Sequence, residues 1–186
     1  MIKRLFDFVC SFFLIIIFSP AMILIAIFVK IDSQGPIIFL QKRVGRYGSP
    51  FYIYKFRTMY TNMYSSNSYK TLENDIRITK FGRVLRRTSL DEIPQLLNVL
   101  LGDMSLVGPR PNVYEQKANY TKEEWSIRNS VRPGITGLAQ AKIRSASDPL
   151  ERTRLDLLYI ERHSLFFDIK IIFLTLKQLF IIKNVN

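Results

Sequence analysis

The sequence predicts an α+β protein that is mainly helical, with one small β-hairpin and an apolar segment at its N-terminus. Three observations lead to this fold class. Apolar residues make up 48 % of the 186 residues, and they are concentrated near the two ends of the chain. Between the ends, two short runs rich in β-branched and aromatic residues are followed by several stretches of helical pattern. The length fits one domain that is large enough to bury a core.

The N-terminal apolar segment carries no charged residue from position 8 to position 29. As a straight helix it would be about 33 Å long, enough to cross the hydrocarbon core of a membrane. The run is too long for the apolar part of a signal peptide and no small-residue cleavage motif follows it, so we expect it to be retained. Ser19 and Pro20 stand in its middle. Proline removes a backbone hydrogen bond and kinks a helix, and the serine hydroxyl can satisfy the freed carbonyl inside lipid.

Basic residues flank this segment on both sides: Lys3 and Arg4 before it, and Lys30, Lys42, Arg43 and Arg46 after it. Under the positive-inside rule both ends then face the cytoplasm. This favours a re-entrant, helix–break–helix anchor over residues 1–30, followed by a cytoplasmic domain over residues 31–186. A kinked helix that crosses the whole bilayer remains the alternative.

The C-terminal stretch, residues 165–182, is also strongly apolar. Asp168, Lys170 and Lys177 would make it an expensive membrane span. Two interpretations stay open. It forms an amphipathic helix in the membrane interface, with its lysines reaching the headgroups, or it is a terminal helix packed on the core.

The middle of the chain reads as one compact α+β body without internal repeats. Turn residues separate its two β-rich runs, which predicts a hairpin. A polar stretch follows, and then segments of helical pattern, of which the first ends at Gly102, a typical C-cap. The predicted elements are a hairpin of 37–41 with 51–56, a surface loop at 61–74, and helices at 90–101, 121–128 and 149–161.

Net charge narrows the possible partners. The chain carries 27 Lys+Arg against 15 Asp+Glu, a formal charge of +12. Such an excess indicates nucleic acid, or an anionic membrane together with phosphorylated ligands. Because Cys10 and His163 are the only cysteine and histidine, the sequence excludes an internal disulfide and a Cys/His zinc site.

An adjacent acid pair, Asp91 and Glu92, lies within this basic chain. The simpler interpretation is a helix start, since Ser89 and Glu92 match a capping box. The pair also directly follows Arg86 and Arg87, which we expect to lower both carboxyl pKa values. An ionised carboxylate beside arginines and a helix N-terminus suits phosphoryl transfer through an aspartyl-phosphate, with Mg²⁺ screening the repulsion. No glycine-rich phosphate loop is present, so arginines must bind the phosphate, as Arg110 between two prolines can.

These motifs together resemble a bacterial sugar transferase of the monotopic phosphoglycosyl transferase family. The resemblance runs almost end to end. Its blocks are KRLFD at 3–7, SP at 19–20, KFRTM at 55–59, RRTSLDEIPQ at 86–95, GDMSLVGPRP at 102–111 and VRPGITG at 131–137.

The resemblance implies an anchor broken at Ser19-Pro20 that enters one leaflet of the bacterial inner membrane, with the catalytic domain on its cytoplasmic face. Asp91 would attack the sugar-proximal phosphate of a UDP-sugar and release UMP. Polyprenyl phosphate (undecaprenyl phosphate) would then take the sugar phosphate, the first membrane step of surface glycoconjugate assembly. Asp91 and Glu92 form the dyad that holds Mg²⁺. The substrate-binding residues would be Lys55, Arg57, Arg86, Arg110 and Arg144. The sequence around Arg144 departs from the family's usual Asn-Gly-Arg, so the sugar is not specified.

The competing hypothesis is a non-enzymatic, membrane-anchored binder of nucleic acid or another anionic polymer. Basic charge and nine tyrosines are compatible with it. The chain has no RNP-type aromatic pattern, however, and polynucleotide binding does not require a membrane segment interrupted by Ser-Pro. The charges instead flank the apolar segment, where they meet an anionic leaflet, and surround the acid pair, where a diphosphate would bind.

Overall fold

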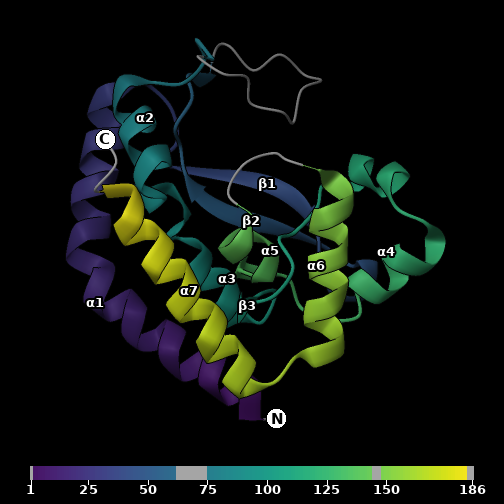
Figure 1. The fold of residues 1–186 in the computed structure, drawn as a ribbon. Helices are drawn as coiled ribbons and strands as arrows, with labels where there is room; N and C mark the ends of the chain where they lie inside the picture. The colour runs from purple at the N-terminus through teal and green to yellow at the C-terminus, as the bar shows by residue number, and fades with distance from the viewer. Residues whose placement is uncertain (1, 62–74, 144–147, 184–186) are drawn as a thin grey trace.

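The computed structural model describes residues 2–61, 75–143 and 148–183, the side chains of 179–183 excepted. Figure 1 shows short helices gathered around a two-stranded hairpin, with the long helix α1 along one side. The predicted class, mainly helical α+β with a small hairpin, is confirmed. The predicted loop at 61–74 lies, apart from its first residue, outside the described residues.

Helix α1 spans Ile2–Asp32 as one α-helix with Pro20 inside it, and by length and composition it could cross a membrane. Its ribbon bends part-way along (Figure 1), yet the helix continues, so the predicted break between two helices is not present. Proline has no N–H for the Ile16 carbonyl, four residues earlier. The Ser19 hydroxyl donates to that oxygen instead, at 2.8 Å, as predicted. Re-entry into one leaflet stays a prediction.

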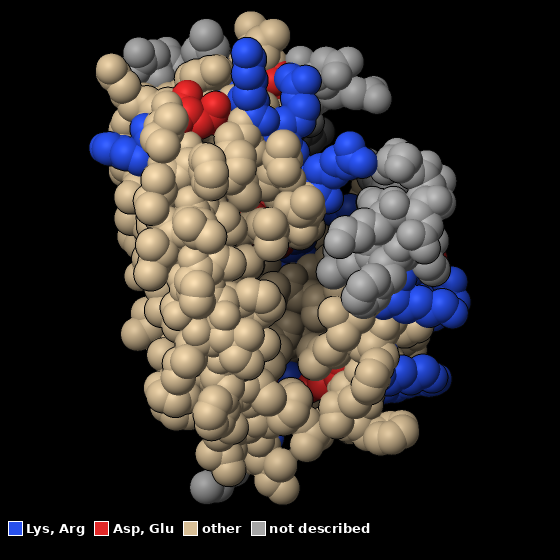
Figure 2. All heavy atoms as spheres, turned by 90° about the vertical axis from the view of Figure 1, so that its left-hand side faces the viewer, with Lys and Arg blue, Asp and Glu red and all other residues tan. Residues whose placement is uncertain are grey.

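Both halves of α1 pack against the same body. Near its N-terminus, Asp7 is buried and accepts from the Ser105 hydroxyl and the Leu106 amide, each at 3.1 Å. Near its C-terminus, Ile25 and Val29 are buried in a second hydrophobic cluster. The outer side of α1 is apolar, and Figure 2 shows it as a broad face without charged side chains, with Lys and Arg around its upper end and right-hand edge. Its exposed residues include Phe12, Phe13, Ile16, Ile17, Ile23, Leu24, Ile27 and Phe28.

The predicted hairpin is confirmed, with longer strands. Strand β1 (Ile38–Val44) pairs antiparallel with β2 (Pro50–Phe56), and the 3₁₀ turn η1 (Arg46–Gly48) connects them. In this register Phe39 lies opposite Lys55, and paired residues share one face of the hairpin. Residues 39, 41 and 43 therefore face the same side as 51, 53 and 55.

The predicted helix at 90–101 is two elements. After α2 (Lys80–Thr88) come the 3₁₀ turn η3 (Leu90–Glu92) and then α3 (Gln95–Leu101), which ends at Gly102 with φ of 102° as predicted. The predicted capping box is wrong, because Ser89 adopts the left-handed conformation and its side chain makes no capping bond. Ser89 ends α2, and its amide bonds back to that helix.

The remaining elements close the core. Strand β3 (Ser105–Val107) pairs parallel with β4 (Gly134–Thr136), and α5 (Leu138–Lys142) follows. After η4 (Tyr114–Asn119), the helices predicted at 121–128 and 149–161 are present as α4 (Lys122–Arg128) and α6 (Pro149–Arg162).

The C-terminal helix α7 (Leu165–Lys183) packs one side on the core, the second of the two interpretations above. Ile171 is fully buried in the main hydrophobic cluster, and Asp168 accepts from the Tyr159 hydroxyl at 2.8 Å. Asp168, one of the charges that would make a membrane span expensive, is thus buried and hydrogen-bonded within the protein. Phe166 and Phe173 remain exposed on the other side, so a membrane-facing role for that side stays a prediction.

Candidate active site

The acid pair lies in the η3 turn between α2 and α3. The left-handed Ser89, with φ of 58°, reverses the chain direction after α2, and Pro94 precedes α3. Asp91 is 8 % exposed and the Glu92 side chain 17 %. On α3, the buried Asn98 accepts from the Tyr54 amide at 3.0 Å and donates to the Tyr52 carbonyl at 2.8 Å. This amide ties α3 to β2 and so holds the acid pair beside the hairpin.

Glu92 is held by two cations. Its Oε1 accepts from the Lys55 ammonium at 2.7 Å and from the Arg110 guanidinium at 2.6 Å, and its Oε2 lies 3.4 Å from the same guanidinium. Burial pushes the pKa of Glu92 upward, but the charges and hydrogen bonds of Arg110 and Lys55 bring it well below its usual range. Glu92 is therefore a fixed anion that orders the two cations.

Asp91 differs from its neighbour. Burial raises its pKa, the charge of Glu92 raises it further, and Lys55, Arg86 and Arg110 only partly oppose this. The prediction that adjacent arginines lower the pKa is thus wrong for Asp91, because the sequence does not show its burial. None of the hydrogen bonds or ion pairs found among the described residues ends on its carboxylate. Asp91 is thus a carboxylate near the charges of Lys55, Arg86 and Arg110 that none of the described residues binds directly.

Two further cations lie around the pair. Arg86, on α2, donates to the Thr58 hydroxyl at 2.8 Å and acts on Asp91 through its charge. Gly82 permits this approach of α2, because a Cβ there would lie 2.3 Å from the Thr58 carbonyl oxygen. Sequence reasoning missed Arg43 as a site residue. Burial and the charge of Arg110 lower the pKa of Arg43 to about 10. The alternation of strand residues, which places Arg43 on the same face of the hairpin as Lys55, is the sequence signal that could have found it.

The structure does not bring Arg57 to the acid pair. Arg57 is 2 % exposed, and its guanidinium donates to the carbonyls of Val29 and Ser33 and to that of Pro36. It closes the C-terminal end of α1, so its predicted contact with substrate finds no support in this geometry. Arg144 lies outside the described residues, and its predicted role stays a prediction.

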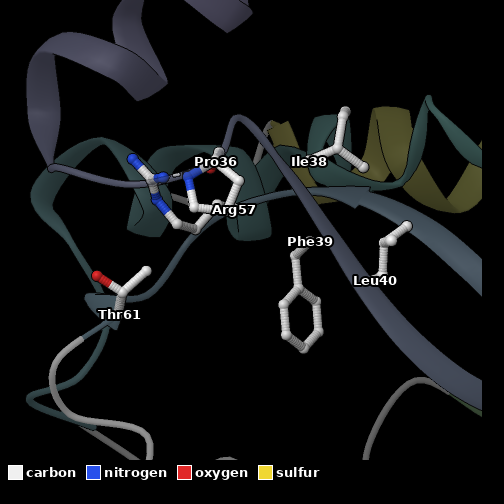
Figure 3. Close-up of a pocket in the computed structure, with 6 residues that line it drawn as sticks. All are labelled: Pro36, Ile38, Phe39, Leu40, Arg57 and Thr61. Carbon is white, nitrogen blue, oxygen red and sulfur yellow. Dashed lines mark hydrogen bonds between the residues drawn. The ribbon is translucent and has the colours of Figure 1, made fainter.

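A pocket of about 260 Å³ opens beside the start of β1, next to the site and not at the acid pair. Figure 3 shows Arg57 against Pro36 at one end and Leu40 at the other. Phe39, which lines the pocket, lies opposite Lys55 in the hairpin, so the pocket adjoins the hairpin face that carries Lys55. It is lined by Pro36, Ile38, Phe39, Leu40, Arg57 and Thr61.

The protein supplies only part of the oxygen ligands that Mg²⁺ needs. Within the described part of the chain, three or more Asp, Glu, His or Cys side chains nowhere gather as a metal cluster. Glu92 is engaged by two cations, which leaves the Asp91 carboxylate as the accessible oxygen ligand. Mg²⁺ commonly binds through one or two carboxylates together with substrate phosphates and water, so the Asp91 carboxylate suffices for an ion that arrives with a diphosphate.

An apolar helix on one side and an acid pair among cations on the other are the combination that fits membrane association and phosphate binding. Comparison with known proteins makes the class specific. The family model "Bacterial sugar transferase" matches residues 1–181, and the chain belongs to this family. The resemblance read from the motifs is therefore confirmed.

Relatives support the assignment. A UDP-glucose:undecaprenyl-phosphate glucose-1-phosphate transferase of Klebsiella pneumoniae is 45 % identical over 98 % of this chain and 41 % of its own length. A UDP-N-acetylgalactosamine-undecaprenyl-phosphate N-acetylgalactosaminephosphotransferase of Aeromonas hydrophila is 40 % identical over 96 % of this chain and 43 % of its own. The sugar transferase EpsL of Bacillus subtilis, of uncharacterised activity, is 40 % identical over 100 % of this chain and 90 % of its own. The chain thus spans about two fifths of the length of the first two.

Proposed function

We propose that the protein transfers a sugar-1-phosphate from a UDP-sugar to a polyprenyl phosphate, releasing UMP. One observation carries the proposal: among the described residues no hydrogen bond ends on the Asp91 carboxylate, while its neighbour Glu92 holds two cations at 2.7 and 2.6 Å. A nucleophile must be free to move onto phosphorus, and the charge around it must already be in place. The activities for which the relatives from Klebsiella and Aeromonas are named agree with this chemistry.

In the proposed reaction an Asp91 oxygen attacks the phosphorus that bears the sugar. The bond from this phosphorus to the bridging oxygen breaks, and UMP leaves with the electron pair. An oxygen of polyprenyl phosphate then attacks the same phosphorus, which frees the Asp91 carboxylate and forms a polyprenyl diphosphate-sugar. Arg110, Lys55 and Arg86 bind the diphosphate and stabilise the charge that develops on its oxygens. Mg²⁺, when bound at Asp91 beside Glu92, would add further charge screening.

The lipid acceptor explains the membrane helix. Since both halves of α1 contact one body, that body sits beside the helix along its whole length, and this arrangement favours entry into one leaflet over a span that ends on the far side. We place the protein on the cytoplasmic face of the bacterial inner membrane, with its apolar face in lipid and the flanking Lys and Arg on anionic headgroups. The exposed Phe166 and Phe173 of α7 would reach the same interface.

The test uses the whole chain purified in detergent with polyprenyl phosphate, Mg²⁺ and a panel of UDP-sugars. We expect UMP release with at least one sugar and, when the acceptor is omitted, an intact-mass increase equal to a sugar phosphate on Asp91. Asp91→Asn should abolish both signals. Release of UDP in place of UMP, or full turnover by the Asn variant, would refute the covalent phosphosugar route. Salt-sensitive binding to single-stranded nucleic acid without turnover would support the alternative, which no relative described above favours.

A further inference from the structure

The segment that carries Arg110, residues 109–112, has an unusual set of backbone contacts. All four of its carbonyl groups accept a hydrogen bond from a distant part of the chain. Pro109 and Asn112 accept from the amides of Gly134 and Val44, at 3.0 and 2.9 Å. The two middle carbonyls accept from arginine side chains. We call this segment the Arg110 strap.

Arg128 holds the first of the middle carbonyls. Its guanidinium donates to the Arg110 carbonyl at 2.7 Å and forms an ion pair with Asp156 at 2.9 Å. The Arg128 and Asp156 side chains are each 2 % exposed. The pair therefore joins α4 and α6 under the strap, and Asp156 fixes the direction in which Arg128 points.

Arg43 holds the second middle carbonyl from the hairpin side. It donates to the Pro111 carbonyl at 3.1 Å, while Gln41 accepts from the same guanidinium at 3.1 and 2.5 Å. The ion pairs found in the described part of the chain do not include Arg43, and Glu92 and Glu115 act on its half-buried charge only from a distance. Two guanidiniums thus grip consecutive carbonyls of a segment whose prolines have no N–H to pair.

We propose that Arg43 and Arg128 are positioning residues that hold the Arg110 guanidinium on Glu92. Arg110 has a side chain 43 % exposed, so packing alone does not fix where its charge lies. Its backbone position must supply that order, and a displacement of about 1 Å is enough to cost roughly a hundredfold in rate at a charged site. The inference rests on the proposed function for its kinetic readout only.

The test combines kinetics with amide hydrogen exchange on the whole chain in detergent. Arg128→Met and Arg43→Met should each lower kcat/KM for the UDP-sugar by about ten- to a hundredfold. In an Arg110→Ala background the same changes should cost less than about twofold more, because their effect passes through Arg110. Losses that multiply in full in that background would show a general structural role and overturn the proposal. Arg154→Met, an exposed arginine on α6, is the matched control and should match the parent protein.

Amide hydrogen exchange measures how firmly the Arg110 strap is held, and it needs no enzymatic reaction. The Gly134 and Val44 amides, which bond to its ends, should exchange at least roughly tenfold faster in both variants, with the amides that pair β1 and β2 unchanged. Unchanged exchange at Gly134 and Val44 would overturn the proposal. If Arg128→Met does not fold, since it leaves Asp156 buried without its partner, Arg43→Met decides, because it removes a donor only from two neutral groups, the Gln41 amide and the Pro111 carbonyl. Faster exchange in a protein that turns over no UDP-sugar would uphold the strap and refute the proposed function.

Discussion

Replacing Glu92 with Gln tests whether this carboxylate is the anion that orders the site. The substitution keeps the shape and one acceptor oxygen but removes the charge. Two short hydrogen bonds end on Oε1, from Lys55 at 2.7 Å and from Arg110 at 2.6 Å. A hydrogen bond to a charged group contributes about 1.5–3 kcal/mol, and a neutral one about half of that. The loss is therefore about 1–1.5 kcal/mol for each bond.

Solvent reduces this sum, because the Arg110 side chain is 43 % exposed and regains water when its partner is lost. We expect a net destabilisation of about 1.5–2.5 kcal/mol, which lowers Tm by about 3–10 °C in a chain of this size. Thermal unfolding in one detergent at pH 7 measures it. Glu151→Gln is the control, since Glu151 forms only an exposed pair with Arg154 at 3.5 Å and should shift Tm by about 1 °C or less.

The pH dependence supplies the refuting result. The pKa of Glu92 is lower in the folded protein than in the unfolded chain, so its ionised form contributes stability above about pH 4.3 that is lost as the pH falls toward the folded pKa. The gap between parent and Glu92→Gln should be full at pH 6–8 and shrink below about pH 4. A gap that is absent at pH 7, or that stays constant down to pH 3, would show that Glu92 does not hold Lys55 and Arg110 as an anion.

Three other changes test separate parts of the structure. Asp91→Asn should abolish UMP release yet leave Tm equal or higher, because burial and the Glu92 charge raise the pKa of Asp91 and disfavour its ionised form; a clear fall in Tm would contradict this. Arg57→Met should lower Tm by about 5 °C or more, through lost bonds to the carbonyls of Val29 in α1 and of Ser33 just after it, with KM for the UDP-sugar within about twofold; a large KM rise would restore its predicted substrate contact. Ser19→Ala should lower Tm by about 2–4 °C, and adding Pro20→Ala should recover it by returning an N–H to the Ile16 carbonyl; no recovery would contradict that role of the serine.

Elements whose cause lies within a few residues were predictable from the sequence. The hairpin follows from its β-branched runs, the end of α3 from Gly102, and the hydroxyl contact in α1 from Ser19 next to Pro20. The acid pair was also located, because two adjacent carboxylates in a basic stretch stand out by residue type alone. In each case local chemistry and the folded structure agree.

Features set by distant contacts were not predictable. Arg57 has the same charge in the sequence as Arg110, but the carbonyls that take it up belong to residues 21 to 28 positions earlier. The left-handed Ser89 serves as the C-cap of α2, and this role overrides the capping-box pattern. The pKa of Asp91 depends first on burial, and burial is a property of the fold.

The contacts of α1 connect the apolar helix to the candidate active site at both of its ends, which is more than an anchor requires. At one end of α1, Arg57 binds the last turn of the helix. Arg57 follows Lys55 by two residues, and Lys55 binds Glu92. At the other end, Lys3 donates to the Val107 carbonyl at 3.2 Å, shortly before the Arg110 strap. The two cations on Glu92 are therefore each tied to one end of the apolar helix. Because α1 fixes both at once, the acid pair has a set position relative to the apolar face, and the proposed transfer to a lipid phosphate would use this fixed relation.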